Sequence, residues 1–588
     1  MKPSHHLLRF ALSLVLFLPW SAPISFSQTG SPYFATDSYG DSAARLVALK
    51  QGWSTKEREW FYSTSQGSQL MPYAYYLALE QAGNNRPFND PANLQKFRCI
   101  PRSRDASNPD GLPVGFVADP DSPLPKGFIK DRRSLGFTCA ACHTGQINYK
   151  GTAIRIDGGP SLADFDSLTK ALEASLKATF NQNAKFDRFA RKVLVGENND
   201  AGHRAMLRAY LAEAIKEGGD YIWLNHSDLD YGFGRLDAFG RIFNRALVII
   251  ESHRHIMPNA PVSFPFLWDT PRADRVQWTG SAVNGFLGSL GRNVGEAVGV
   301  FAAVDMTAKR PPVAYTSSAS FHNLRSLEHR LRALKSPQWP AEILPAIDSR
   351  KAAAGQVLFQ DHCVQCHPRV NTFPLARSYT AARTPIADTN DREGVQTDAT
   401  AAALIRDSRD APTGILKGAK KGILLGKETY GDTADVFPIT QDTVGRLLVG
   451  SLFGPKLDQS RRVKLAGNVE HHKSSKLLKM TPPSDYLKDL RYSGRSLDGI
   501  WATAPYLHNG SVPTLYDLLL PEAQRPKTFS VGRREFDPIK VGYVTRPTPG
   551  TFLFNTKLKG NSNKGHDYGT SRMSEEQRMQ LVEYLKTL

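Results

Sequence analysis

Two short stretches of the chain place cysteine and histidine at a spacing suited to binding a porphyrin. Each reads C-x-x-C-H, with the residues Cys139, Cys142 and His143 in one and Cys363, Cys366 and His367 in the other. On a helical turn, residues three positions apart share a face, so both thiols can form thioethers with the vinyl groups of one haem. The histidine then lies beneath the ring as proximal iron ligand. The sequence therefore predicts two covalently bound c-type haems.

A zinc site or a redox-active dithiol is the alternative for a motif of this kind. A structural zinc site built from four cysteines, or from two cysteines and two histidines, needs further ligands at suitable spacing. The chain has five cysteines, of which four belong to the two motifs. The sequence thus favours haem, and we expect Cys99, which has no partner left for a disulfide, to be a buried and unreactive thiol.

The N-terminus has the composition of a secretion signal. Lys2 and Arg9 precede an apolar run from Phe10 to Leu18, and small residues such as Ser27 follow before a possible cleavage point. The run is too short to span a bilayer, and no later stretch resembles a transmembrane segment. We therefore predict a signal peptide over residues 1–27 and a periplasmic or secreted mature protein.

The length of 588 residues, with 41% hydrophobic and 22% charged residues, suffices for two or three globular domains. The formal net charge of +18 can attract anionic partners or surfaces, but an ordinary basic surface is the favoured explanation. No groove-reading motif is apparent, so nucleic acid is not an expected partner.

Helical periodicity dominates the two segments that position the motifs. Apolar residues recur every three or four positions between Ser161, a candidate N-cap, and Phe180, and further helices are predicted over Ala201–Glu217 and Leu236–Glu251. Tyr149–Asp157 partly alternates, which indicates a short strand or hairpin. The segment Ala381–Thr429 is predicted to be an extended loop with short helices.

A helix starting near Ser349 leads directly into the second motif, and Ser574 with Gln577 can form a capping box for the last helix. These two helices resemble the first and last helices of a small cytochrome c. We expect them to cross closely, with Gly355 and Phe359 against one or more of Leu581, Tyr584 and Leu585.

The expected fold is mainly α, with two cytochrome c-like haem domains, long loops and few short strands. We expect one domain over residues 28–345, with a helical insertion, and another over residues 346–588. The chain would then be a rough internal duplication with one haem in each half.

Several longer segments resemble the bacterial dihaem cytochrome c peroxidases, and more closely the branch that contains the exported dihaem rubber oxygenase. They are F-Y-x-T-x-Q-G-S at Phe61–Ser68, N-P-D-G-L-P at Asn108–Pro113, L-G-F-T-C-A-A-C-H-T-G at Leu135–Gly145, Q-W-x-G at Gln277–Gly280, R-N-V-G-E at Arg292–Glu296, and W-A-T-A-P-Y-L-H-N-G-S-V-P-T-L at Trp501–Leu515. This resemblance implies that the haem on His143 is the reactive one and that the haem on His367 transfers electrons.

In the peroxidases a tryptophan lies between the haems and a glutamate acts as distal acid–base. The positions here that match best are Trp278 and Glu296, although W-T-G-S replaces the family's W-D-G-R. A carboxylate near the distal face can move a proton between the two oxygens of peroxide. The alternatives are a core aromatic for Trp278 and a salt bridge with a cation such as Arg292 for Glu296.

The peroxidases also close the first haem at rest with a histidine soon after the motif. No histidine occurs here between His143 and His203. His253 and His255 could substitute, but we expect them at the surface and the distal site open or blocked by an apolar side chain. The resemblance also suggests an aromatic pocket, for which the candidates are Phe239, Phe243 and Phe266, each also a candidate for simple core packing.

The second haem requires a sixth ligand. His566 is the first candidate, because it sits in a polar loop, Gly560–Tyr568, that resembles the ligand-bearing loop of the branch. His508 belongs to the P-Y-L-H-N-G motif and by resemblance supports a propionate. Met480 is a third candidate ligand.

The sequence thus supports three hypotheses. The first is a peroxidase that takes electrons from a small cytochrome c or cupredoxin and reduces hydrogen peroxide. The second is a dioxygenase of the rubber oxygenase kind that uses dioxygen to cleave an apolar alkene. The third is an electron carrier whose two irons are both six-coordinate.

Overall fold

A computed structural model describes the chain from Asp37 to its C-terminus, apart from residues 38, 42, 126, 130, 195 and 381 and the segments 285–287, 307–314, 371–378, 387–393, 423–425, 454–455, 467–475 and 479–489. The predicted signal peptide, residues 1–27, lies outside the described residues. In the part that the structure describes, no helix is both long and apolar enough to cross a membrane.

A three-stranded sheet, β1–β6–β5, includes the two strands that directly follow the first C-x-x-C-H motif in the chain. Strands β5 (Thr144–Tyr149) and β6 (Thr152–Asp157) form an antiparallel hairpin, and β1 (Arg45–Ala48) pairs in parallel with β6. The hairpin turns through Lys150 and Gly151, which both have positive φ, as a tight two-residue turn requires. The prediction of a short hairpin over Tyr149–Asp157 is confirmed, although its first strand begins earlier.

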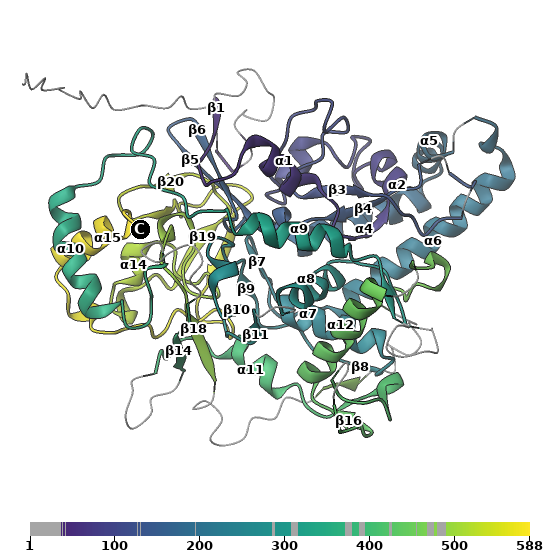
Figure 1. The fold of residues 1–588 in the computed structure, drawn as a ribbon. Helices are drawn as coiled ribbons and strands as arrows, with labels where there is room; N and C mark the ends of the chain where they lie inside the picture. Colours follow the sequence, from purple (N-terminus) through teal and green to yellow (C-terminus); the bar gives the residue numbers. More distant parts are fainter. Residues whose placement is uncertain are drawn as a thin grey trace, which may run out of the picture.

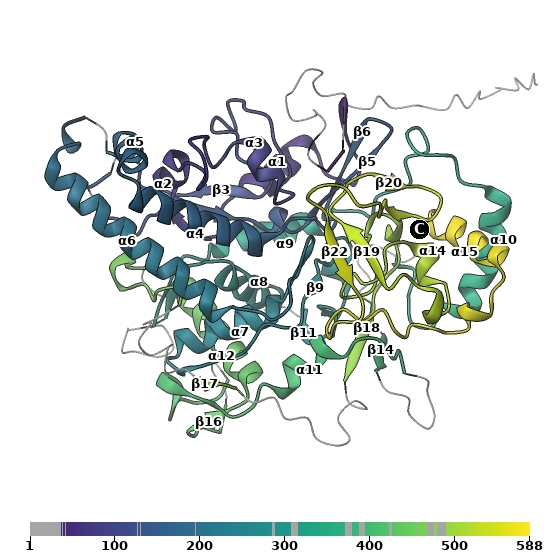
Figure 2. The same cartoon turned by 180° about the vertical axis from the view of Figure 1, so that it is seen from behind.

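Seven helices form one side of the molecule (Figures 1 and 2). They are α4 (Phe165–Asn181), α5 (Asn183–Val193), α6 (Ala201–Leu224), α7 (Ala238–Ile249), α8 (Gly288–Gly299), α9 (Phe321–Leu331) and α12 (Val436–Phe453). Helix α4 packs on α6, and α7, α8 and α12 pack together. The three helices predicted after the first motif are confirmed, but Asp164, rather than Ser161, caps α4 by accepting a hydrogen bond from the Ser167 amide.

Helices α10 (Ser349–His362) and α15 (Glu575–Leu585) lie at the opposite end of the molecule (Figure 1). They cross so closely that a Cβ atom on Gly355 would lie 2.0 Å from the Gln580 carbonyl oxygen. The rings of Phe359 and Tyr584 pack with centroids 5.2 Å apart. The structure also has the capping box of Ser574 and Gln577. The predicted crossing of these two helices is therefore confirmed.

The expectation of a mainly α fold with two cytochrome c-like domains and few strands is wrong. Helix accounts for 38% of the structure and strand for 16%, spread over many small sheets. The first motif follows a strand, β4 (Ser134–Phe137), whereas the second follows helix α10, so the two halves do not repeat one design. Most strands have only two to four residues, too few for alternation to be visible in the sequence.

The remaining elements are short. The helices are α1 (Thr55–Ser63), α2 (Tyr73–Ala78), α3 (Pro91–Gln95), α11 (Thr400–Asp407) and α14 (Leu515–Leu518). The strands form the sheet β2 (Met71–Pro72), β4, β3 (Phe116–Asp119) and the pairs β7 (Arg235–Leu236) with β9 (Val262–Ser263), β8 (Arg254–His255) with β17 (Lys476–Leu477), β10 (Arg275–Val276) with β11 (Ala282–Val283), β12 (Val304–Asp305) with β13 (Thr316–Ser317), β14 (Ala382–Pro385) with β18 (Arg491–Gly494), β15 (Ala411–Pro412) with β16 (Thr433–Ala434), β19 (Thr528–Val531) with β22 (Phe552–Asn555), and β20 (Phe536–Asp537) with β21 (Gly542–Tyr543).

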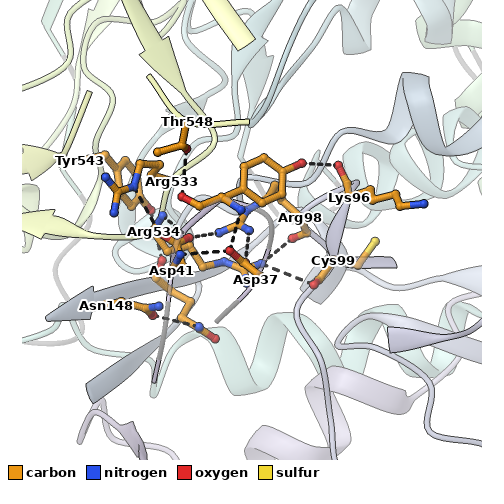
Figure 3. Close-up of polar contacts among 12 residues, drawn as sticks. Asp37, Asp41, Lys96, Arg98, Cys99, Asn148, Arg533, Arg534, Tyr543 and Thr548 are labelled. Atoms are coloured by element: carbon orange, nitrogen blue, oxygen red, sulfur yellow. Dashed lines mark hydrogen bonds and ion pairs between the residues drawn. The ribbon is translucent and has the colours of Figure 1, made fainter. Parts of the chain in front are cut away.

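A buried ionic cluster joins the start of the described chain to its C-terminal part (Figure 3). The Arg98 guanidinium pairs with Asp37 at 2.6 Å and also with Asp41. The Arg534 amide donates to Asp41 at 2.7 Å, and its guanidinium donates to the Arg98 carbonyl at 2.7 Å. Because an unpaired charge in such a place would be costly, these groups hold the two ends of the chain together.

The α10–α15 crossing yields a stability prediction. We expect Gly355→Ala to lower the free energy of unfolding by about 1–3 kcal/mol, since the added methyl group collides with the backbone of α15. Chemical denaturation followed by circular dichroism measures this change. Gly218→Ala, in helix α6, is the control, because a Cβ atom on Gly218 would have no neighbour closer than 3.5 Å. Gly218→Ala should leave stability unchanged or raise it; an equal loss in both variants would contradict the prediction.

Candidate haem sites

Each C-x-x-C-H motif forms a single helical turn. The His143 amide donates to the Cys139 carbonyl at 2.9 Å, and the His367 amide donates to the Cys363 carbonyl at 2.9 Å. Strand β18 ends directly against the second motif, where a Cβ on Gly494 would lie 2.3 Å from the Cys366 carbonyl oxygen. None of the four motif cysteines forms a disulfide. Both turns therefore present two free thiols and a histidine, as the spacing predicts.

Both motif histidines are held through the same ring nitrogen. His143 Nδ1 donates to the Pro265 carbonyl oxygen at 2.7 Å, and His367 Nδ1 donates to the Arg495 carbonyl oxygen at 2.7 Å. A proton on Nδ1 leaves the Nε2 lone pair free to bind a metal. Burial lowers the pKa of His143 to about 4 and also lowers the pKa of His367. Both rings are thus neutral, oriented and suited to an axial position on haem iron.

Each histidine lines its own cavity. The first cavity is bounded by Cys139, Cys142 and His143 and by a largely apolar wall that includes Phe137, Phe165, Phe266, Phe301, Leu327 and Leu331. Its polar lining includes Gln277, Arg292, Asn293 and Glu296, from α8 and the segment before it. Among its described lining residues there is no second histidine and no methionine.

Glu296 lines the first cavity, and no described lysine, arginine or histidine forms a salt bridge with it. The Gln277 side-chain amide donates to its carboxylate at 2.9 Å, and burial raises its pKa. Arg292 pairs instead with Glu328 at 2.6 Å. The alternative role of Glu296, an ion pair with Arg292, is thus not the arrangement in the structure. A carboxyl group with a raised pKa facing a cavity can hold and release a proton.

Gln277 was not predicted as a site residue, although it begins the Q-W-x-G segment. Its φ is +68°, a left-handed conformation that costs a residue with a side chain about 1–2 kcal/mol. Gly280, with φ +62°, closes the turn, because its amide donates to the Gln277 carbonyl at 3.0 Å. This turn directs the Gln277 amide toward Glu296 and Trp278 toward the other cavity.

The second cavity contains two histidines that face each other. The rings of His367 and His566 have centroids 6.1 Å apart with an interplanar angle of 51°. Both line the cavity with Cys363 and Cys366. His566 has φ +55°, its amide donates to the Val395 carbonyl at 2.7 Å, and burial lowers its pKa to about 3. This separation is suited to two neutral imidazoles on opposite sides of one iron.

His508 lines the same cavity but has another partner. Its Nε2 lies 3.1 Å from the Tyr492 hydroxyl, and the two rings stack with centroids 4.2 Å apart. Burial lowers the pKa of His508 to about 4. This engagement suits a supporting role rather than iron ligation. Met480, the third candidate ligand, lies outside the described residues.

The other candidate residues divide between the cavities and the core. Trp278 lines the second cavity, and its indole Nε1 donates to the Ser263 carbonyl at 2.9 Å. Phe266 lines both cavities. Phe239 and Phe243, on α7, pack in the core and line neither cavity. His253 and His255 also lie away from both, with the His255 ring against Trp223 at 5.4 Å.

The alternative of a zinc site gains no support from the ligand set. Among the described residues, no group of three or more histidine, cysteine, aspartate or glutamate side chains is placed to hold a metal ion. Cys99 is buried, and burial raises the pKa of its thiol to about 12. Its predicted burial is confirmed, and a thiol that stays protonated is a poor nucleophile.

The chain is similar in sequence to two proteins of Sinorhizobium fredii. Over 596 aligned residues it is 32% identical to "Uncharacterized protein y4iJ" of Sinorhizobium fredii, and the alignment covers 92% of this chain and 93% of that protein. The chain belongs to the y4iJ family. A second Sinorhizobium fredii relative, "Uncharacterized protein y4iM", is 26% identical over 341 residues, which cover 56% of this chain and 62% of the relative.

One segment of this y4iJ family member also matches a family model described as "RoxA-like, cytochrome c-like". The matched residues, 491–530, include Tyr492, Arg495 and His508 around the second cavity. The match shows a relationship to RoxA-like cytochromes c and implies bound c-type haem. It covers a single segment in the C-terminal half, so it agrees with the structure in giving no support to two cytochrome c-like domains.

The opposed imidazoles of the second cavity yield a spectroscopic prediction. We expect His566→Ala to convert a low-spin haem signal partly to high-spin in the electronic and electron paramagnetic resonance spectra, because an iron on His367 would lose its sixth ligand. His508→Ala is the matched control, since it removes a histidine of the same cavity whose Nε2 is engaged by Tyr492. The assignment is lost if only His508→Ala produces the high-spin signal.

Proposed function

We propose that this y4iJ family member is an exported dihaem c-type oxidoreductase that reduces hydrogen peroxide. One haem would be held by Cys139, Cys142 and His143, and the other by Cys363, Cys366 and His367 with His566 as sixth ligand. The observation that carries the proposal is the inequality of the two cavities. The first offers one histidine and a protonatable glutamate, and the second offers two opposed histidines.

When bound, a c-type haem supplies an iron atom that takes up peroxide or dioxygen and exchanges electrons. The Pro265 carbonyl keeps the His143 ring oriented with Nε2 toward the cavity. Glu296 would carry a proton from one peroxide oxygen to the other, and the Gln277 amide holds its carboxylate in place for this transfer. The apolar wall limits the access of water and so strengthens these electrostatic effects.

Reduction of one peroxide to two water molecules consumes two electrons and two protons. We propose that the electrons enter through the second haem from a small cytochrome c or cupredoxin. Trp278 would couple the two sites, since it lines the second cavity while Val276 and Gln277, just before it, line the first. The net charge of +18 favours a donor with an acidic surface.

We propose that each haem is held by a different part of the chain. Residues 28–345 would hold the reactive haem and residues 346–588 the electron-transfer haem. Covalent haem attachment on the far side of the bacterial membrane agrees with the predicted signal peptide at residues 1–27 and with a periplasmic or secreted protein.

A dioxygenase that cleaves an apolar alkene is the second candidate. The RoxA-like match over residues 491–530 and the aromatic and aliphatic wall of the first cavity favour it. Glu296 opposes it, because a carboxyl group fits poorly in a pocket for hydrocarbon. Turnover of peroxide with a reduced cytochrome, compared with oxygen uptake on adding an unsaturated polymer, distinguishes the two. A pure electron carrier would bind no carbon monoxide in the ferrous state.

The number of haems can be counted directly. We expect the pyridine haemochrome of the purified protein to give two porphyrins per chain, and Cys139→Ser/Cys142→Ser and Cys363→Ser/Cys366→Ser to retain one each, because each pair of thiols forms one set of thioethers. Cys99→Ser is the control and should retain both. A count of two in either double variant would show that its motif carries no covalent haem.

The role of Glu296 can be measured by steady-state kinetics. We expect Glu296→Gln to lower peroxide turnover about 10²–10⁴-fold, the usual contribution of a general acid–base, without changing the haem count. The control is Glu213→Gln. Glu213 is half-exposed, pairs with Lys464 and lies far from both motifs in the sequence. An unchanged rate in Glu296→Gln would remove Glu296 from the mechanism.

A further inference from the structure

The two cavities share a wall in the middle of the molecule. Strands β9, β10 and β18 lie there, between the helical group and the α10–α15 pair (Figures 1 and 2). The Ser493 amide donates to the Trp278 carbonyl at 2.8 Å, and the Ser263 amide donates to the His508 carbonyl at 2.9 Å. Two segments far apart in sequence, 263–278 and 493–508, are thus interlaced. We call them together the shared wall.

Arg495 is the charged residue of the shared wall that lines both cavities. Its guanidinium packs over the Phe266 ring at 3.9 Å and lies 5.6 Å from the centre of the Trp278 ring. Burial lowers its pKa only to about 10, so it stays a cation at neutral pH. Its Nη1 is buried and has no hydrogen-bond partner among the described residues. Such a donor is available to an anionic group that enters a cavity.

A continuous series of contacts runs from one motif histidine to the other through Arg495. His143 Nδ1 donates to the Pro265 carbonyl, and Arg495 Nη2 donates to the carbonyl of the next residue, Phe266, at 2.7 Å. The Arg495 carbonyl in turn accepts from His367 Nδ1. The side chain of Arg495 therefore holds the peptide next to the one that orients His143, while its main chain orients His367.

We propose that Arg495 is a positioning residue shared by the two haem sites: it orients both proximal histidines and places one positive charge between the two irons. This inference rests on the proposed function, because it requires both sites to hold haem. A cation near an iron stabilises the form with one more electron. Removal of this charge should therefore lower the reduction potentials of both haems, although each lies in a different half of the chain.

The test is a spectroelectrochemical titration of the holoprotein with Arg495→Gln. We expect both midpoint potentials to fall. The control is Arg491→Gln at the start of β18, the strand that ends just before Arg495. The Arg491 side chain donates to the Arg383 carbonyl and lines neither cavity, so this variant should leave both potentials unchanged. A fall at only one haem, or at neither, overturns the proposal.

Arg495→Lys provides a second variant if the glutamine variant does not accumulate. It keeps the charge but lacks the planar fork that spans the distance to the Phe266 carbonyl. We expect the iron–histidine band of the first site to shift in the resonance Raman spectrum of the ferrous protein, while the low-spin marker bands of the second site, whose histidine is held by the main chain, stay. An unshifted first band overturns the proposal. The haem count of each sample separates the outcomes, since fewer than two porphyrins per chain would instead refute the proposed function.

Discussion

The orientation of each motif histidine depends on one hydrogen bond from its Nδ1 to a backbone carbonyl. Neither carbonyl is near its histidine in sequence, because Pro265 holds His143 and Arg495 holds His367. A backbone acceptor cannot be replaced by a single substitution, so its position depends on the packing of its whole segment. The shared wall supplies both acceptors, and the short strands around it are the framework that keeps them in place.

The same five-residue motif can serve different chemistry because its surroundings differ. At the first cavity, α8 and the turn at Gln277 bring polar groups around a single histidine. At the second, the loop that carries His566 places another imidazole opposite His367. In haem proteins the occupant of the axial position distinguishes a reactive iron from an electron-transfer iron. The difference between the two cavities arises from residues such as Glu296 and His566, each of which lies 100 or more positions after the motif whose cavity it lines.

Local patterns predicted the parts of the structure that depend on local geometry. The motif turns, the helices after the first motif, the capping box of α15 and the contact of Gly355 with α15 all follow from spacing along one element. The small sheets were not predictable, since strands of two residues have no periodicity and pair with remote partners. For the same reason the sequence offered Glu296 and His566 as candidates but gave no sign of Gln277 or Arg495, whose importance lies in contacts made across the fold.

The ionic cluster of Figure 3 has a consequence for biogenesis. Arg98 and its carboxylate partners are made early, but Arg534 follows Arg98 by 436 residues, so the cluster is completed only when almost the whole polypeptide has emerged. Until then the N-terminal part, which includes Cys139 and Cys142, lacks the hydrogen bonds that Arg534 makes to Asp41 and Arg98. During that interval these thiols, which the finished fold partly encloses, would be accessible to the enzymes that attach the proposed haem. Late closure of the chain would thus set the order in which cofactor loading and maturation take place.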